Sequence, residues 1–295
     1  MRSFDDYKRL VEDNLLSYLP EAGDPASVLN DAMKYSLSIG GKRLRPVLLL
    51  ASCDAAGGDI QRALPYACAI EYIHTYSLIH DDLPAMDNDD MRRGKPSNHK
   101  VYGEAVAILA GDALLNSAAE LIAGQGLNVI GDTAALAAHT LAAHEILSRS
   151  GASGMIAGQT ADVISEDKEA TAELLEYIDA HKTADLIAAP IRAGLMLAGA
   201  SDAMLDDFTV YARNIGISFQ IADDILDFEG SEELVGKTLG KDSDQNKCNY
   251  VSVHGMNAAK EKLHQLTEEA KASIENYDSS GFFIGLADMM EHRKN

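Results

Sequence analysis

The stretch Ile79-His-Asp-Asp-Leu-Pro-Ala-Met-Asp-Asn-Asp-Asp-Met-Arg-Arg-Gly-Lys-Pro96 places five aspartates within ten positions, Asp81 to Asp90. The residues before it are typical of a helix. Pro84 lacks a backbone donor and clashes with the preceding turn, so we expect that helix to end near Asp82. Carboxylates crowded at a helix C-terminus are unfavourable, because the helix dipole already places negative charge there. The stretch therefore predicts either a solvated acidic loop or a loop that binds a cation.

Two arginines follow the aspartates at once and favour the second interpretation. Arg92 and Arg93 put paired positive charges into the same short loop. Mg²⁺ is usually held by one or two carboxylates together with phosphate oxygens. Acids and bases side by side are typical of a metal-bridged phosphate site, with Asp81, Asp82 and Asp87 as the metal ligands.

A second acidic cluster lies in Phe219-Gln-Ile-Ala-Asp-Asp-Ile-Leu-Asp227, an apolar stretch of helical character. Asp223 and Asp227 are four residues apart and share one helix face, with Asp224 beside them. Burying such carboxylates without a partner would cost on the order of several kcal/mol each. Two separate Asp-Asp clusters in one helical chain indicate metal binding more strongly than either cluster alone.

Basic residues in glycine-containing turns are candidates for holding phosphate. Gly40-Gly-Lys-Arg-Leu-Arg-Pro46 precedes an expected helix over residues 47–56, whose free N–H groups would attract an anion. Further candidates are Lys237, in the loop after the second cluster, and Lys247. The loop is not a P-loop, because Ser231 occupies the position of that motif's first glycine.

The bulk composition predicts one large all-α domain over residues 1–295. Hydrophobic residues make up 46% of the chain, and long Ala- and Leu-rich stretches such as 105–122 and 133–148 are apolar on more than one face. We expect these to be interior helices of a bundle. The net charge of −21 argues against nucleic acid or an anionic membrane as a partner.

The three cysteines lack metal-site spacing, and their odd number predicts no disulfide framework. The N-terminus is acidic and has no apolar core, so we expect no targeting segment. Together these features predict a cytoplasmic protein. No uncharged apolar run is long enough to cross a membrane.

In their order along the chain, these motifs resemble the trans-isoprenyl diphosphate synthases, and within them the bacterial enzymes that make farnesyl diphosphate. The resemblance covers nearly the whole chain. It rests on Gly40–Pro46, the stretch from His74 to Asp87, Arg92–Pro96, Gly111-Asp112, Gly154-Met155, Gly158-Gln159-x2-Asp162, Lys182-Thr183, Phe219–Asp227 and Gly236-Lys237.

The resemblance implies a role for each matching residue. The metal ligands would be the two aspartate clusters, holding about three Mg²⁺ ions. Isopentenyl diphosphate would be bound by Lys42, Arg45, His74 and Arg93, with Arg293 as a further basic residue near it. The allylic diphosphate, dimethylallyl or geranyl, would be held by Arg92, Lys182, Thr183, Gln220, Lys237 and Lys247.

The implied fold is a helical bundle around a central cavity, and the implied assembly is a homodimer. The implied reaction condenses isopentenyl diphosphate with the allylic diphosphate to give (2E,6E)-farnesyl diphosphate and pyrophosphate. In this family the fifth residue before the first aspartate forms the floor of the chain pocket. Here that residue is Tyr76, followed by Ser77, and its bulk predicts a fifteen-carbon product.

Two departures from the family pattern have no assigned effect. Ala184-Asp185 follows Lys182-Thr183 where the family has Gly-Ala, and Asn249 stands where it has Thr. The alternatives to the predicted activity are a geranylgeranyl diphosphate synthase, which Tyr76 disfavours, and a non-catalytic prenyl synthase subunit. Such subunits tend to lose one aspartate cluster, and this chain keeps both. A terpene cyclase would have little use for a second diphosphate site.

Overall fold

The computed structural model describes residues 1–165, 171–229 and 249–293. Within these ranges nearly all regular structure is helical, and the strands are limited to one two-stranded hairpin. The elements are α1 Phe4–Leu15, α2 Val28–Ser38, α3 Leu44–Ala55, α4 Ile60–Asp81, β1 Met91–Arg92, β2 Lys95–Pro96, α5 Asn98–Tyr102, α6 Glu104–Leu127, α7 Thr133–Ser150, α8 Met155–Ser165, α9 Ala172–Ile178, the π-helical turn η1 Asp179–Ala184, α10 Asp185–Ala198, α11 Asp202–Glu229, α14 Tyr250–His254, α15 Met256–Ile274 and α16 Phe282–Glu291. The predicted all-α bundle is confirmed.

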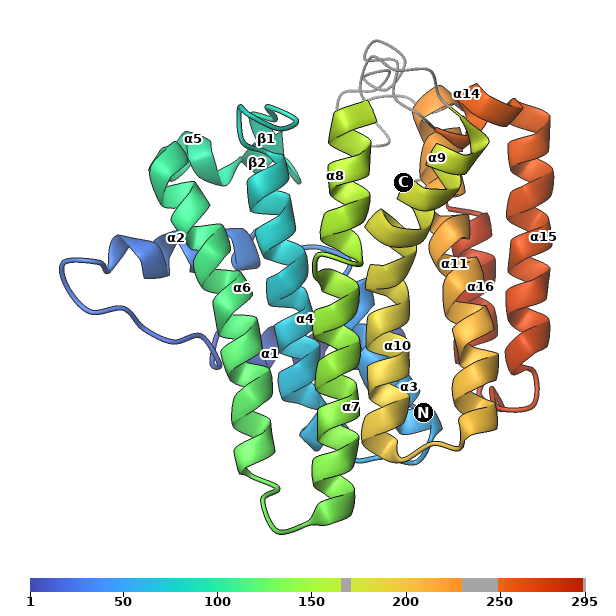
Figure 1. Ribbon diagram of the computed structural model, residues 1–295, viewed down its shortest axis with the longest axis horizontal. Helices are drawn as coiled ribbons and strands as arrows, with labels where there is room; N and C mark the ends of the chain where they lie inside the picture. The colour runs from blue at the N-terminus through green and yellow to red at the C-terminus, as the bar shows by residue number, and fades with distance from the viewer. Residues whose placement is uncertain (166–170, 230–248, 294–295) are drawn as a thin grey trace.

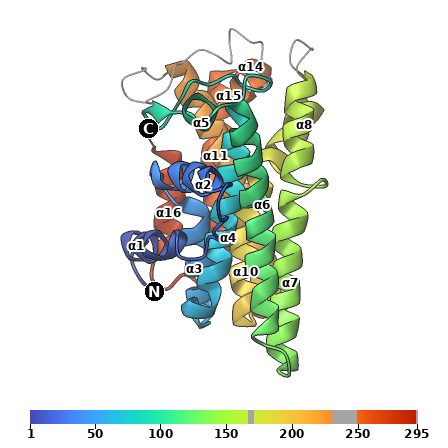
Figure 2. The same ribbon diagram turned by 90° about the vertical axis from the view of Figure 1, so that its left-hand side faces the viewer.

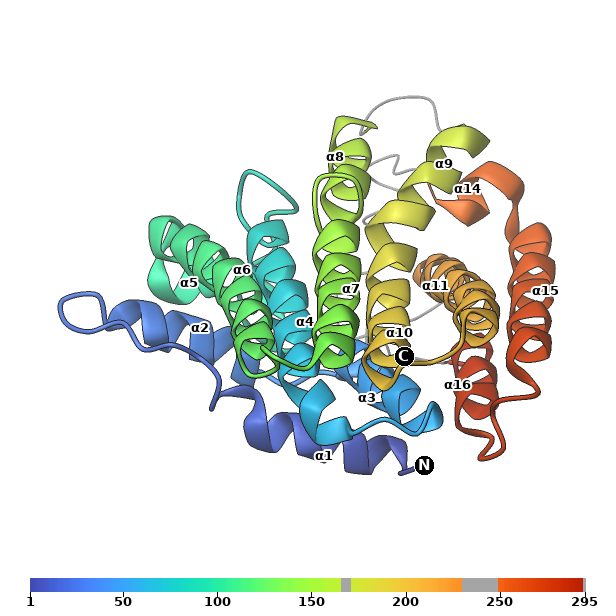
Figure 3. The same cartoon turned by 60° about the horizontal axis from the view of Figure 1, so that its bottom comes forward.

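The long helices lie side by side, with their axes roughly along one direction (Figure 1). Helix α10 is the most central: ten of its fourteen residues are buried, and it packs against α3, α4, α7 and α11. Figure 3, seen from one end of the bundle, shows α10 between α7 and α11. The end of α4 therefore sits on a rigid packed frame.

Helices α1 and α2 lie outside the long helices, beside α3 and α4 (Figure 2). Helix α1 buries Tyr7, Val11 and Leu15 against the main core, and Ser3 closes its first turn as a capping box. This arrangement fixes the short segment between α2 and α3 that contains Lys42, and the start of α3 that contains Arg45.

The expectation that residues 105–122 and 133–148 are interior helices is wrong in part. Their limits agree with α6 and α7, but Ile108 and Leu109 of α6 and Leu141 of α7 are exposed. Among the described residues, α6 is also the one helix long and apolar enough to cross a membrane by length and composition, with 39% of its apolar window buried, which is weak evidence. The second apolar face of these helices points outward.

Candidate active site

The first aspartate cluster lies where α4 ends. The helix stops at Asp81, as Pro84 predicts. The backbone N–H of Asp87 donates to the carbonyl of Asp81 (2.8 Å), and that of Asp89 to the carbonyl of Asp82 (3.2 Å). These bonds fold the acidic loop back onto the helix end, so Asp87 returns toward Asp81.

The surroundings of Asp81 disfavour its ionised form. Burial raises its pKa to about 6, and Asp87 and Asp82 add to the rise, although Lys182 opposes it. The Nε2 of Gln159, on α8, donates to its Oδ1 at 3.0 Å. A half-buried carboxylate next to two others is a poor anion by itself and a good ligand for a cation.

Asp82 is already paired. It is buried, and the guanidinium of Arg92 binds it through Nε at 3.0 Å and through Nη2. Burial opposes the charge on Arg92, but the hydrogen bond to Asp82 and the nearby aspartate charges together outweigh burial and raise the pKa of Arg92. The β1–β2 hairpin supplies Arg92, so two residues predicted for one site do meet there.

The second cluster lies on α11. Asp223 forms an ion pair with Arg293 (Oδ1 to Nη1, 2.9 Å), and the guanidinium carbon of Arg293 lies 4.5 Å from the centre of the Phe219 ring. Asp227 is half-buried one turn further along the same helix. The structure thus brings the C-terminal arginine to the acidic cluster, whereas the resemblance implied a place near isopentenyl diphosphate.

Asp224 faces a different direction and closes a hydrogen-bonded chain. It is buried and accepts bonds from the Nε2 of Gln220 (2.9 Å) and from the backbone N–H of Tyr250 (2.7 Å). The Oε1 of Gln220 in turn accepts a bond from the hydroxyl of Thr183 (2.9 Å). Three predicted residues are therefore joined in one network that also fixes α14.

Lys182 and Thr183 lie in the π-helical turn η1, which packs against α8 and α11. The ammonium of Lys182 forms a close ion pair with Asp162 of α8. The turn can approach α8 because position 158 is a glycine: a Cβ there would lie 2.1 Å from the backbone nitrogen of Lys182. The Gly158-Gln159-x2-Asp162 motif thus places Lys182 near Asp81.

Asp179, at the start of η1, is a functional candidate that the sequence reasoning missed. It is buried, and its pKa rises to about 8 through burial and through the nearby carboxylates Asp224 and Asp162. Gln159 and Asp162 belong to a motif that carries the family resemblance, but the resemblance implied no role for either residue. The available signal for Asp179 was its place three residues before the Lys182-Thr183 motif.

The basic residues predicted for isopentenyl diphosphate gather beside these acids. Burial lowers the pKa of His74 well below its ordinary value, and the charges of Arg45 and Arg93 lower it further. Burial, with a smaller contribution from Arg93, lowers the pKa of Arg45 to about 10. Burial also lowers the pKa of Lys42, with Arg293 adding to the effect. Crowded cations of this kind are suited to an anionic ligand.

The segment before α3 is shaped by one close contact. The Nη1 of Arg93 donates to the carbonyl of Gly40. Gly41 has a φ of +145°, and a Cβ on it would lie 2.5 Å from that Nη1. The two glycines therefore leave the space that lets the Arg93 side chain lie beside the other basic residues.

Tyr76 lies inside the protein below Asp81. Its side chain is buried, its hydroxyl has no hydrogen-bond partner among the described residues, and its ring meets His80 edge-on at 5.7 Å. At about 1.5 Å per residue it is roughly 7 Å down the helix from Asp81. The hydroxyl of Ser77 donates to the carbonyl of His74 (2.9 Å), so Ser77 is occupied locally.

Both departures from the family pattern have structural explanations. Asp185 points toward α7, where it pairs with Arg149 (2.5 Å) and accepts from His181 Nδ1 (2.8 Å), and not toward Lys182. Asn249 is the N-cap of α14 and accepts from the backbone N–H of Ser252 at 2.8 Å. Lys237 and Lys247 lie outside the described residues.

Comparison with known proteins agrees with this geometry. The sequence model of the polyprenyl synthetase family matches residues 26–280. The chain belongs to the polyprenyl synthetase family.

Within the polyprenyl synthetase family, the chain is similar along nearly its full length to enzymes of two product classes. It is 48% identical over 292 residues to the geranylgeranyl diphosphate synthase of Cyanophora paradoxa, covering 98% of this chain and 94% of that protein. It is 47% identical over 277 residues to the farnesyl diphosphate synthase of Geobacillus stearothermophilus, covering 94% and 91%. Overall identity therefore does not separate the two classes.

Solved structures of the family share the fold. The apo structure of an FPP/GFPP synthase from Zymomonas mobilis has a TM-score of 0.84 at 30% identity and covers 98% of this chain and 97% of that one. A geranyltransferase from Legionella pneumophila has a TM-score of 0.84 at 32% identity and covers 99% and 96%. The single helical unit of this chain thus corresponds to whole chains of its relatives.

Proposed function

We propose that this chain is a Mg²⁺-dependent prenyltransferase that condenses isopentenyl diphosphate with dimethylallyl and geranyl diphosphate to give (2E,6E)-farnesyl diphosphate. Membership of the polyprenyl synthetase family makes the chain a prenyltransferase of a class that uses a divalent metal. The observation that carries the rest is the pairing of two acidic clusters with one crowded basic group. An acidic protein with this arrangement can bind an anionic substrate through a cation.

The acidic residues fit hard divalent ions. Their donors are carboxylate oxygens, and burial, with a smaller contribution from the neighbouring acids, raises the pKa of Asp81 to about 6, so a bound cation would stabilise its ionised form. We assign Asp81, Asp87 and Asp223 as the principal holders of about three Mg²⁺ ions, with Asp227 nearby. Mg²⁺ bound there supplies charge stabilisation for a departing pyrophosphate. Asp82 and Asp224 are occupied by Arg92 and by Gln220, so we expect them to support the site.

The protein's own groups would bind and orient the two substrates. Arg92 and Lys182 carry fixed positive charge toward the allylic diphosphate, while Lys42, Arg45, His74 and Arg93 surround the other diphosphate. The bond between C1 and the diphosphate oxygen breaks, the double-bond electrons of isopentenyl diphosphate form the new C–C bond, and a proton leaves to pyrophosphate. The oxygens of Thr183 and Gln220 would stabilise the positive carbon.

Tyr76 supports a fifteen-carbon product. A large buried ring roughly 7 Å below Asp81 limits the space along α4. The geranylgeranyl alternative is favoured by one observation, the 48% identity to the Cyanophora enzyme. The pocket residue is the more direct determinant of chain length, so we prefer farnesyl diphosphate.

The decisive experiment is incubation with Mg²⁺, isopentenyl diphosphate and either allylic diphosphate, followed by product chain-length analysis. We expect farnesyl diphosphate and stoichiometric pyrophosphate. Asp81→Asn and Asp223→Asn should each lower kcat by about 10²–10³-fold, the order seen when one electrostatic stabiliser is removed. Asp206→Asn, an exposed acid on the same helix α11, is the matched control and should keep full activity. Absence of pyrophosphate release would contradict the enzyme proposal, and a twenty-carbon product would replace the assigned chain length.

We further propose a cytoplasmic homodimer formed through α6 and α7. The supporting observation is the exposed apolar face of these helices, where Leu109 and Leu141 are each 57% exposed. Exposed apolar side chains that gather on adjacent helices are typical of an interface.

A further inference from the structure

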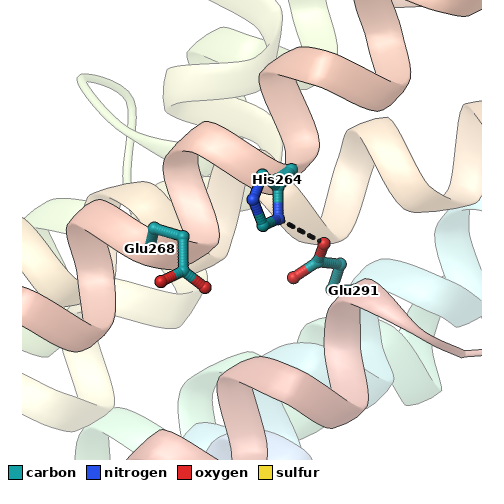
Figure 4. Close-up of side chains that lie close together, drawn as sticks. All are labelled: His264, Glu268 and Glu291. Carbon is teal, nitrogen blue, oxygen red and sulfur yellow. Dashed lines mark hydrogen bonds and ion pairs between the residues drawn. The ribbon is translucent and has the colours of Figure 1, made fainter.

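Three potential metal ligands gather on the outer surface of α15 and α16, and none belongs to the site described above. His264 and Glu268 are four residues apart on α15, so both project from one face. Glu291 is the last residue of α16. Figure 4 shows the three side chains directed toward one another from the two helices. Their ligand atoms all lie within 4.8 Å of one another, and His264 Nδ1 is 2.9 Å from Glu291 Oε1.

We propose that His264, Glu268 and Glu291 form a surface site for a divalent transition-metal ion such as Zn²⁺, which fastens the end of α16 to α15. One imidazole with two carboxylates suits Zn²⁺, whereas Mg²⁺ prefers oxygen donors alone. Donors bonded to Zn²⁺ at about 2.0–2.2 Å lie roughly 3–4 Å apart. The observed spacing therefore needs only side-chain rotation and no movement of the helices.

The surroundings allow this rotation at low cost. Glu268 now pairs with Lys271 (2.5 Å), but Lys271 also pairs with Asp288 (2.9 Å) and keeps that partner when Glu268 turns away. His264 and Glu268 are exposed, so the ion keeps water in its remaining positions. Glu291 is the anchored member, because only 14% of its side chain is exposed.

The site lies close in sequence to a residue of the candidate active site. Glu291 is two residues before Arg293, which pairs with Asp223 at 2.9 Å and lies over Phe219. An ion bound at Glu291 would hold the chain segment that presents Arg293. The metal site itself does not depend on the proposed prenyl transfer, and it can be tested without any substrate.

The test is a Zn²⁺ titration of the full chain against a chromophoric chelator, with Mg²⁺ in large excess to occupy the aspartate clusters. We expect the unaltered chain to bind one Zn²⁺ equivalent. Its affinity for Zn²⁺ should fall at least about tenfold in His264→Ala and in Glu291→Gln, because removing a metal ligand weakens binding at least as much as removing a residue that only supports a ligand. The exposed residues His144→Ala and Glu275→Gln are matched controls and should bind as the unaltered chain does.

Thermal unfolding gives a second, independent readout. Zn²⁺ should raise the Tm of the unaltered chain and of both controls, and should leave the Tm of His264→Ala and Glu268→Gln unchanged. Because both replaced side chains are exposed, their Tm without Zn²⁺ should match the unaltered chain. Zn²⁺ affinity or Tm gain retained in the His264 and Glu268 variants would overturn the site. A prenyltransferase assay without product would leave this result untouched.

Discussion

The carboxylates of the two clusters are not equivalent at the scale of single residues. Asp82 and Asp224 are buried and fully engaged, the first by Arg92 and the second by Gln220 and a backbone N–H. Asp81 is half-buried beside other acids and has a raised pKa. The sequence presents both members of each Asp-Asp pair alike, but packing buries Asp82 and Asp224 and leaves Asp81 and Asp223 half-buried.

Tyr76 is the residue for which a substitution should change the product. Tyr76→Ala removes the ring from the inner part of α4 and opens space for further isoprene units. We expect products of twenty carbons or more to become dominant, measured by chromatography of the dephosphorylated products. The hydroxyl has no partner, so Tyr76→Phe should leave the product length unchanged. An identical product distribution for Tyr76→Ala would contradict the role as pocket floor.

Asp179 should make the stability of the metal-free protein fall with pH. Its pKa is about 8 in the folded state and 3.8 ordinarily, so between these values the folded state binds more protons than the unfolded state. The free energy of unfolding should therefore fall as pH rises from 6.5 to 8, and level off above 8.

The pH effect of Asp179 can be isolated by substitution. Asp179→Asn should remove most of this fall, which amounts to about 1–2 kcal/mol between pH 6.5 and 8 at about 1.4 kcal/mol per pH unit. Urea unfolding in EDTA at several pH values measures this. His74 acts in the opposite direction, because its pKa is lowered in the folded state and its unfolded imidazole loses its proton around pH 6.5, so its effect fades as pH rises through the window. Asp206→Asn should keep the slope of the unaltered chain, and an unchanged slope in Asp179→Asn would refute the assignment.

Among the elements, α8 and the π-helical turn η1 form the contact that positions Lys182. This contact depends on Gly158, because a Cβ there would lie 2.1 Å from a backbone nitrogen, and backbone cannot move aside as a flexible side chain can. The helix α8 then sends Gln159 to Asp81 and Asp162 to Lys182. A short helix thus links the first acidic cluster to η1.

Gly158→Ala should separate α8 from η1. We expect a loss of about 1–3 kcal/mol in the free energy of unfolding, the usual cost of overpacking, with a larger KM for the allylic diphosphate. Gly124→Ala on α6 is the control, since nothing lies within 4 Å of its added Cβ. That change should instead stabilise the protein by about 0.5–1 kcal/mol. Equal stability of the two variants would show that the close contact is unimportant.

The whole molecule has an acidic surface and one apolar face. The net charge of −21 keeps chains apart, whereas Ile108, Leu109 and Leu141 expose apolar surface on α6 and α7. A soluble assembly would cover such a face with its own copy in a closed two-fold pair.

Leu109→Glu should convert the proposed dimer into a monomer. A charge buried at the centre of an apolar interface has no partner, and its desolvation opposes association. Light scattering after size-exclusion chromatography should change from about twice 31.6 kDa to about 31.6 kDa. Met289→Glu, at an exposed apolar residue of α16, should remain dimeric. A monomeric unaltered chain would contradict the proposal directly.

Features set by neighbours along the chain were determined by the sequence alone. Pro84 ends α4 at Asp81 because its ring acts on the preceding turn. The four-residue spacing of Asp223 and Asp227 puts them on one face of α11, because a helix has a fixed period. The all-α class and both acidic clusters could therefore be predicted from spacing and composition.

Contacts between distant segments were decided only by the tertiary structure. Gln159 meets Asp81 across 78 positions, and Arg293 reaches Asp223 from the end of the chain. The outward face of α6, the turn of Asp185 toward Arg149 and the burial of Asp179 depend likewise on how helices pack. Local spacing fixes the face of a helix on which a side chain lies. Which partner that face meets depends on the free energy of packing the whole bundle, and no local pattern contains it.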